Sequence, residues 1–214
     1  MGTDGVLLGA WADITKAERI LDIGTGTGVI ALMLAQRSSP SAHIDAIDIS
    51  NEEFLQSSEN FQSSSWSEKI KAHHCALQDF EAPRYDLIVS NPPFFIDSAK
   101  PPKTERARAR HTETLSPDNL LEHVARLIKE TGKFCVILPT AEGELFIASA
   151  KKVNLHCVRR CEFHSREHKP TERLLLEFRF HEYPYSAEKL VLYIQDEIWT
   201  EEYKLLTRDF YLKS

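Results

Sequence analysis

Leu21-Asp22-Ile23-Gly24-Thr25-Gly26-Thr27-Gly28-Val29 is the stretch of this chain that decides its fold. Three alternating glycines directly follow a short apolar run, residues 19–23, and precede an apolar segment with helical spacing, residues 29–37. Glycine adopts left-handed backbone angles without a steric penalty, so this stretch predicts a tight turn between a strand and a helix. Such a unit is typical of α/β proteins that bind ligands at the carboxyl ends of parallel strands.

The rest of the chain repeats this alternation. The expected strands are residues 19–23, 43–49, 70–77, 85–90, 133–138, 154–164 and 172–181, and the expected helices are residues 4–11, 29–37, 51–61, 116–132 and 142–152. The last two long strands have no helix between them, which indicates an antiparallel pair. We therefore predict an α/β, doubly wound, mostly parallel seven-stranded Rossmann-like sheet with an antiparallel edge hairpin.

Several local details accompany this prediction. Asp4 is expected to cap the first helix, and Ser116 followed by a proline is expected to cap the helix that stops near Gly132. In the helix at 51–61, Leu55 is expected to face inward with the two phenylalanines. A strand-like run at 190–194 and the aromatic end, Asp209-Phe210-Tyr211-Leu212, are expected to dock against the domain.

The composition predicts one compact domain over residues 1–214. Its 42% hydrophobic and 27% charged residues are ordinary for a soluble protein, and no linker or internal repeat divides the chain. No apolar stretch approaches the roughly 20 residues that cross a bilayer, and no signal peptide is evident, so we expect a cytoplasmic protein. The four cysteines lack a convincing metal-ligand spacing, which predicts reduced core residues and no metal site. A monomer is favoured.

The glycine spacing favours S-adenosylmethionine as the cofactor. A dinucleotide site needs Gly-x-Gly-x-x-Gly, whereas this turn has Gly24, Gly26 and Gly28, with Asp22 two residues before the first of them. S-adenosylmethionine brings a cationic amine, which Asp22 or the carbonyls of the turn can meet, and it has no pyrophosphate that would need a helix N-terminus. The alternative is that these glycines serve close packing alone.

Polar residues follow the next two expected strands. Asp48 ends the second strand, about 20 residues after the turn, where a carboxylate accepts hydrogen bonds from both ribose hydroxyls. Asp79 ends the third strand and is expected to accept from the adenine amino group of the cofactor. Its neighbour Gln78 is expected to contact the cofactor as well. The alternative for these acids is that they cap helices.

Asn91-Pro92-Pro93-Phe94 follows the fourth expected strand and predicts methylation of a planar amino nitrogen. Such a nitrogen is a poor nucleophile because its lone pair is delocalised. Hydrogen bonds from its two hydrogens to the Asn91 side-chain oxygen and the Pro92 carbonyl would strengthen as positive charge develops. Prolines cannot donate backbone hydrogen bonds, and Phe94 offers a stacking face. We therefore expect these four residues to be catalytic, with Asn91 also beside the cofactor; the alternative is a structural turn.

The local distribution of charge points to nucleic acid, although the net charge is -6. The residues expected to contact a nucleic acid are Lys100, Lys103, Arg106, Arg108, Arg110 and His111. A second basic cluster comprises Lys151, Lys152, Arg159, Arg160, Arg166, Lys169 and Arg173. Both clusters are candidate phosphate contacts, and the alternative for the first is a solvated charged loop.

With these motifs the chain resembles the class I methyltransferases that modify exocyclic amino groups, and more narrowly the bacterial tRNA-valine adenine-N6 methyltransferases. The matching stretches are residues 2–11, 21–28 and 91–95, together with Arg108-Ala109-Arg110-His111 and residues 209–213. The resemblance implies N6-methyladenine beside the anticodon of a valine tRNA as the product, and the anticodon stem-loop as the partner. It also implies that Gly2, Thr3 and Asp4 line the amino-acid end of the cofactor. Family members carry a short segment before Gly2, so a trimmed N-terminus is a further expectation.

Two other functions remain open from the sequence. The same chemistry could act on a guanine of ribosomal RNA, an adenine of DNA or a glutamine of a protein. The fold could also serve a non-catalytic RNA-binding protein, because a fold does not dictate a function.

Overall fold

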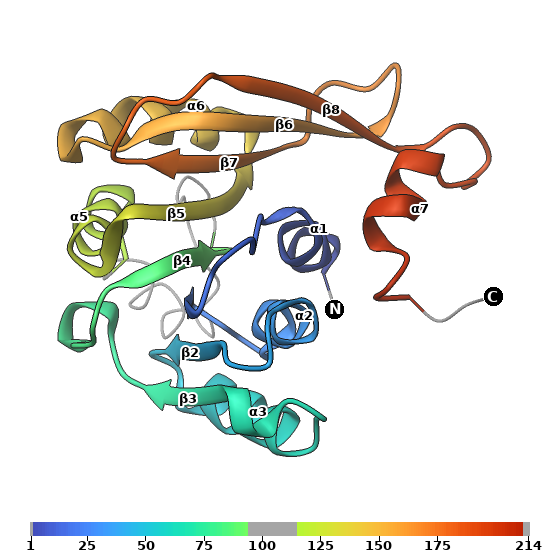
Figure 1. Cartoon of the computed structure of the whole chain (residues 1–214). Coiled ribbons are helices and arrows are strands. Elements are labelled where there is room, and N and C mark those ends of the chain that lie inside the picture. Colours follow the sequence, from blue (N-terminus) through green and yellow to red (C-terminus); the bar gives the residue numbers. More distant parts are fainter. Residues whose placement is uncertain (1, 94–114, 212–214) are drawn as a thin grey trace, which may run out of the picture.

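The computed structural model describes residues 2–93 and 115–211, and Figure 1 shows a central sheet with helices on both faces. The strand order is β3-β2-β1-β4-β5-β7-β6-β8. The strands are β1 (Arg19–Ile23), β2 (His43–Asp48), β3 (Ile70–His74), β4 (Tyr85–Ser90), β5 (Ile128–Pro139), β6 (His156–Arg166), β7 (Arg173–Arg179) and β8 (Ser186–Tyr193). The α-helices are α1 (Thr3–Trp11), α2 (Val29–Arg37), α3 (Asn51–Gln62), α5 (Pro117–Leu127), α6 (Thr140–Ala150) and α7 (Glu201–Thr207), and the short 3-10 helices are η1 (Ser67–Lys69), η2 (Leu77–Asp79) and η3 (Lys151–Val153).

Two apolar cores, one on each face of the sheet, hold the helices in place. On one face Ile20, Ile44 and Leu87 pack with residues of α1, α2 and α7. On the other face Leu21 and Ile88 pack with residues of α5 and α6. Alternate residues of a strand point to opposite faces, so a strand buried on both sides is apolar throughout, as β1 and β4 nearly are. The predicted doubly wound α/β sheet is confirmed.

The sheet has eight strands, one more than predicted. The additional strand is β8, which contains most of the strand-like run expected at 190–194, pairs in parallel with β6 over residues 186–193 and forms one edge of the sheet. The antiparallel strand β7 therefore lies inside the sheet, between β5 and β6, and the β6–β7 hairpin is not at the edge. The sequence pattern of β8 is weak because Leu190 is its one buried hydrophobic residue.

The junction of α5 and β5 differs from the prediction. The helix was expected to stop near Gly132, but it ends at Leu127 and β5 begins at Ile128. Ile128 pairs with Tyr85 and Lys133 pairs with Leu87, so residues 129–132 form an irregularity in β5. A Cβ at Gly132 would lie 2.9 Å from the Tyr85 carbonyl oxygen, which explains the glycine by close backbone contact.

Other local expectations have mixed outcomes. Ser116 caps α5 as predicted, since its side chain accepts from the Asn119 N–H. Asp4 does not cap α1; Gly2 occupies the N-cap, and Asp4 lies in the first turn. Leu55 was expected inward, but 56% of its surface is exposed.

The C-terminal segment docks as predicted, as far as Tyr211. Phe210 packs against a small cluster of Val6, Ala10 and Met33, and the Tyr211 hydroxyl lies 3.1 Å from that of Tyr203. Leu212 lies outside the described residues. In the described part of the chain, no helix is long and apolar enough to cross a membrane.

Candidate active site at the carboxyl edge of the sheet

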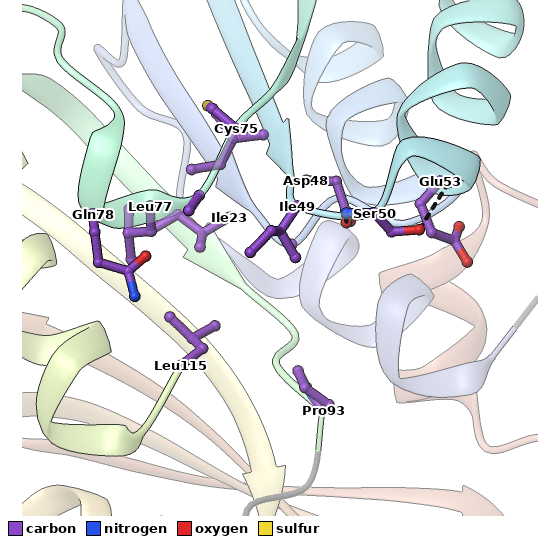
Figure 2. A pocket seen from close by; sticks show the side chains of 13 residues that line it. Ile23, Asp48, Ile49, Ser50, Glu53, Cys75, Leu77, Gln78, Pro93 and Leu115 are labelled. Carbon is purple, nitrogen blue, oxygen red and sulfur yellow. Dashed lines mark hydrogen bonds between the residues drawn. The ribbon is translucent and has the colours of Figure 1, made fainter. Parts of the chain in front are cut away.

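A cleft of about 290 Å³ lies where β1, β2 and β4 end (Figure 2). Parallel strands carry their carboxyl ends to one edge of a sheet, and the loops that follow them enclose a ligand site there. The cleft is lined by Ile23, Gly24, Ile47, Asp48, Ile49, Ser50, Glu53, Cys75, Ala76, Leu77, Gln78, Pro93 and Leu115. Of the predicted cofactor and catalytic residues, the cleft therefore gathers Gly24, Asp48, Gln78 and Pro93.

The three turn glycines all have positive φ angles, of 69° at Gly24, 54° at Gly26 and 84° at Gly28. Their surroundings differ. A Cβ at Gly24 would meet no protein atom within 4 Å, and Gly24 lines the cleft, so the space above it is open to a ligand. A Cβ at Gly28 would lie 2.3 Å from the Phe61 ring of α3. Gly24 thus leaves room in the site, and Gly28 permits close packing of the turn against α3.

The first three backbone N–H groups of the turn donate hydrogen bonds to β2. The amides of Gly24 and Thr25 both donate to the Ile47 carbonyl, at 2.9 and 3.0 Å, and the Gly26 amide donates to Asp48 Oδ2 at 2.9 Å. A phosphate-binding turn needs free amides that point at the anion. The first three amides of this turn are therefore not free to bind a pyrophosphate, in agreement with the glycine spacing.

Asp48 holds both the turn and the start of α3. Its Oδ2 accepts from Gly26, and its Oδ1 accepts from the Ser50 N–H at 2.9 Å. Each carboxylate oxygen retains a second lone pair, so Asp48 can still accept from hydroxyl groups of a ligand in the cleft. The predicted position of Asp48 at the end of the second strand is confirmed.

Glu53, which is not among the site residues predicted from the sequence, is a second carboxylate of the cleft. Ser50 caps α3 by accepting from the Glu53 N–H, and in a capping box the glutamate would accept in return from the Ser50 N–H. Asp48 already accepts from that N–H. The half-buried Glu53 carboxylate has no hydrogen-bond or ion-pair partner within residues 2–93 and 115–211, and it lines the cleft beside the turn.

Apolar side chains form the walls of the cleft further along. Ile49, Leu77 and Leu115 line it, and Figure 2 shows Gln78 and Asp48 on opposite sides of Ile49 in this view. Apolar walls of this kind, with a polar side chain at one end, are typical of sites for flat, uncharged rings. Asp79 does not line the cleft. The third strand ends at His74 rather than near residue 77, and Asp79 lies on η2 with an exposed side chain.

Asp22 lies outside the cleft, contrary to the expected contact with the cofactor amine. Its side chain is fully buried, and its Oδ2 accepts from the Thr25 hydroxyl at 2.7 Å. Burial raises the pKa of Asp22 to about 7, although the bond from Thr25 favours the charged form. Strand alternation explains its direction, because the next residue, Ile23, lines the cleft. The side chain acts on the shape of the turn.

The Asn-Pro-Pro motif follows β4 and meets the rim of the cleft at Pro93. Asn91 is half-buried and Pro92 is buried. The buried Ser90 hydroxyl donates to the Ile23 carbonyl at 2.9 Å, which ties the end of β4 to the end of β1 directly before the motif. The structure therefore brings residues 91–93 next to the glycine turn. Phe94 lies outside the described residues.

The N-terminal motif lies next to the start of β7 and outside the lining of the cleft. Gly2 and Thr3 are exposed, and Asp4 accepts from Arg173 Nε at 2.8 Å at the start of β7. None of the three lines the cleft.

The predicted RNA contacts Lys100, Lys103, Arg106, Arg108, Arg110 and His111 lie outside the described residues. In the second basic cluster, Lys152, Arg159, Arg160 and Arg173 form ion pairs with acids of the chain itself. Among the described residues, no group of three or more His, Cys, Asp or Glu side chains could hold a metal ion.

Comparison with known proteins agrees with this geometry. Residues 4–144 match the methyltransferase small domain family. A protein of Trichodesmium erythraeum named tRNA1(Val) (adenine(37)-N6)-methyltransferase is 44% identical, with 100% of this chain and 91% of that protein covered. The proteins of the same name from Proteus mirabilis and Bacteroides thetaiotaomicron are 44% and 40% identical, with 99% of this chain and 87% and 90% of those proteins covered.

Among solved structures, a predicted O-methyltransferase from Agrobacterium tumefaciens superposes with a TM-score of 0.76 at 15% identity, with 96% of each chain covered. At this identity the likeness shows the fold alone. The family match and the full-length relatives show more: this chain belongs to the methyltransferase small domain family and, within it, to the tRNA1(Val) (adenine(37)-N6)-methyltransferases.

Proposed function

We propose that this protein transfers a methyl group from S-adenosylmethionine to the exocyclic N6 of an adenine in tRNA. The observation that carries the proposal is the meeting, at one edge of the sheet, of the Asn-Pro-Pro motif and a cleft suited to an uncharged nucleoside. The relatives are named for adenine 37 of a valine tRNA, which supports the same target here, with the anticodon stem-loop as the proposed partner.

The described residues fit S-adenosylmethionine. Asp48 and Glu53 would accept from the ribose hydroxyls, the apolar walls would hold the adenine, and Gln78 would meet its polar edge. The open space above Gly24 would take the part of the cofactor that lies over the turn. When bound, S-adenosylmethionine supplies a methyl group already activated by its sulfonium. Gly26 and Gly28 shape the turn, and Asp22 positions it through Thr25.

At the other end of the site, Asn91 and Pro92 act on the target base. The Asn91 side-chain oxygen and the Pro92 carbonyl accept from the two N6 hydrogens, and these bonds strengthen as the nitrogen becomes positively charged. Pro93 fixes the backbone after Pro92, and Phe94 is expected to stack on the ring. Positioning of this kind supplies much of the rate, so the residues need no strong general base.

Further roles follow from the same proposal. Gly2, Thr3 and Asp4 belong to the amino-acid end of the cofactor, and the Asp4–Arg173 pair holds the start of α1 near the carboxyl edge. Residues 100–111 supply cations to the RNA backbone. We also infer that residues 1–214 act as one domain, as a monomer and in the cytoplasm.

The decisive experiment is methyl transfer from labelled S-adenosylmethionine to separate pools of tRNA, ribosomal RNA, DNA and protein, followed by nucleoside digestion. We expect label in tRNA as N6-methyladenosine. We also expect Asn91→Ala to abolish turnover while affinity for S-adenosylhomocysteine stays nearly unchanged. Label confined to guanine of ribosomal RNA, to DNA or to glutamine of protein would show that the enzyme methylates that substrate instead of tRNA. Absence of S-adenosylhomocysteine binding by the wild type would support an RNA-binding protein without catalysis.

A further inference from the structure

The turn between β6 and β7 projects beyond the level of the active site. Strands β4, β5 and β6 run in the same direction, because β6 and β5 are each antiparallel to β7. Phe163 pairs with Arg173, which pairs with Pro139 at the end of β5, and Ser90 is level with Val136. The turn that follows Phe163 therefore lies on the same edge of the sheet as the cleft.

The register gives the position of this turn relative to the site. Arg166 is three residues beyond Phe163, which places it roughly 10 Å above the ends of the neighbouring strands. Strand β6 lies three places from β4 in the sheet, a lateral distance of about 14 Å. A ligand much larger than one nucleotide, seated with its reacting base at the cleft, would reach the turn.

Hydrogen bonds hold the turn in one shape. His164 is buried; its Nδ1 lies 2.9 Å from the Lys169 carbonyl, and its Nε2 lies 3.3 Å from the Thr171 hydroxyl. The Lys169 N–H donates to the Arg166 carbonyl at 3.0 Å, and the Thr140 hydroxyl donates to the Thr171 carbonyl at 2.6 Å. The turn is therefore organised before any ligand binds, which lowers the entropy lost on binding.

The charges on the turn are unbalanced in favour of cations. Its acid Glu167 pairs with Lys189 at 2.5 Å, and Glu172 accepts from Ser165 across the hairpin. In residues 2–93 and 115–211, Arg166 and Lys169 have no carboxylate partner; the Arg166 guanidinium lies over the Tyr193 ring, 5.4 Å from its centre, and Lys169 is exposed. Elsewhere in the second basic cluster, Arg159, Arg160 and Arg173 are neutralised by ion pairs.

From these observations we propose that the β6–β7 turn binds the phosphate backbone of the RNA substrate, with Arg166 and Lys169 as the cations. His168, exposed between them, adds a planar side chain able to stack or donate. This inference rests on the proposed function. Its physical basis is charge: the chain is acidic overall, whereas these two cations on the catalytic edge have no carboxylate partner in the described part of the chain and would attract a polyanion there.

The test is the salt dependence of tRNA binding by the double variant Arg166→Gln/Lys169→Gln. Each lost phosphate contact reduces the slope of log affinity against log salt by about 0.7 to 0.9, so we expect a decrease of about 1.5. The KM for tRNA should rise, and the affinity for S-adenosylhomocysteine should stay unchanged because the cleft is untouched. Circular dichroism and urea unfolding would establish that the variant folds.

A matched control separates local contact from net charge. Lys71 on β3 and Lys16 just before β1 are exposed and lie away from the carboxyl edge, and Lys71→Gln/Lys16→Gln removes the same two charges. We expect this control to keep the wild-type slope. Equal slopes for the wild type and both double variants, or equal decreases in both, would overturn the inference. If the wild type neither binds nor methylates RNA, the proposed function itself fails, which is a different result.

Discussion

At the scale of single residues, the orientation of Glu53 follows from the hydrogen bond made by its neighbour. The pattern Ser50-x-x-Glu53 reads as a capping box from sequence alone, and half of that box is present. Asp48 takes the N–H that would have held the glutamate. Asp48 and Glu53 compete for the Ser50 N–H, and the outcome depends on the path of the backbone between them. That path cannot be predicted from the sequence pattern.

We predict that Glu53→Gln weakens S-adenosylhomocysteine binding about tenfold, the loss expected for one hydrogen bond to a charged acceptor. Titration calorimetry measures it. Glu52→Gln is the matched control, because both acids lie in the first turn of α3 and favour its dipole equally, yet Glu52 is exposed and outside the cleft. An equal loss with a ligand that lacks both ribose hydroxyls would contradict the assigned contact.

Asp22 gives a prediction about pH. Its folded pKa of about 7 lies above the ordinary value of 3.8, because burial disfavours the charged form. Between pH 3.8 and about 7 the folded protein holds a proton on Asp22 that the unfolded chain has released. The free energy of unfolding therefore falls as the pH rises through this range, by on the order of 4 kcal/mol in all, and it stops falling near pH 7. Urea unfolding from pH 4 to 8 should show Asp22→Asn without this decline. Parallel profiles for the variant and the wild type would refute it.

At the scale of elements, the strand–turn–helix unit was predictable and the η2 segment was not. Residues 19–37 carry a strand, glycines and a helix in direct succession, and each signal is local. The sequence predicts a third strand that reaches residue 77, but the strand ends at His74 and the 3-10 helix η2 follows. Such a turn rotates the chain by about a third of a circle per residue, so Gln78 enters the cleft and Asp79 does not.

The glycine turn permits a paired prediction. Gly28→Ala should lower the free energy of unfolding by more than about 2 kcal/mol, because it combines a left-handed φ with a clash against Phe61. Gly24→Ala should cost only about 1 to 2 kcal/mol from its backbone angle, yet it should abolish cofactor binding by filling the cleft. Urea unfolding and calorimetry on both variants check this. Similar losses of both properties in the two variants would show that the glycines share one role.

At the scale of the whole molecule, long-range ion pairs determine the role of Arg159 and the position of β8, which could not be predicted from the sequence. Arg159 reads as a phosphate contact in the sequence, but its guanidinium stacks on Trp11, 4.0 Å from the ring centre, and its Nε donates to Glu188 at 2.7 Å. These three residues join α1, β6 and β8 from distant parts of the chain. The position of β8 at the edge of the sheet depends on such contacts rather than on a local sequence pattern.

We predict that Arg159→Ala lowers the free energy of unfolding by about 2 kcal/mol, because it leaves Glu188 and the Trp11 ring without their shared partner. Urea unfolding measures the loss, and hydrogen exchange should show it first in β8. Lys204→Ala serves as the control, since its exposed pair with Glu201 is worth about 1 kcal/mol or less. Equal effects of the two substitutions would exclude a structural role for the Arg159 contacts.

The hydrogen bonds from the glycine turn to β2 affect which abundant adenosine-containing metabolites can compete for the cleft. ATP and the nicotinamide cofactors carry an adenosine that suits the apolar walls and the ribose acceptors, but their phosphates would arrive where Gly24, Thr25 and Gly26 have no N–H left to donate. Each phosphate oxygen stripped of water without a new donor costs about 1 to 3 kcal/mol. The hydrogen bonds of the turn would thereby favour the methyl donor over these phosphorylated competitors.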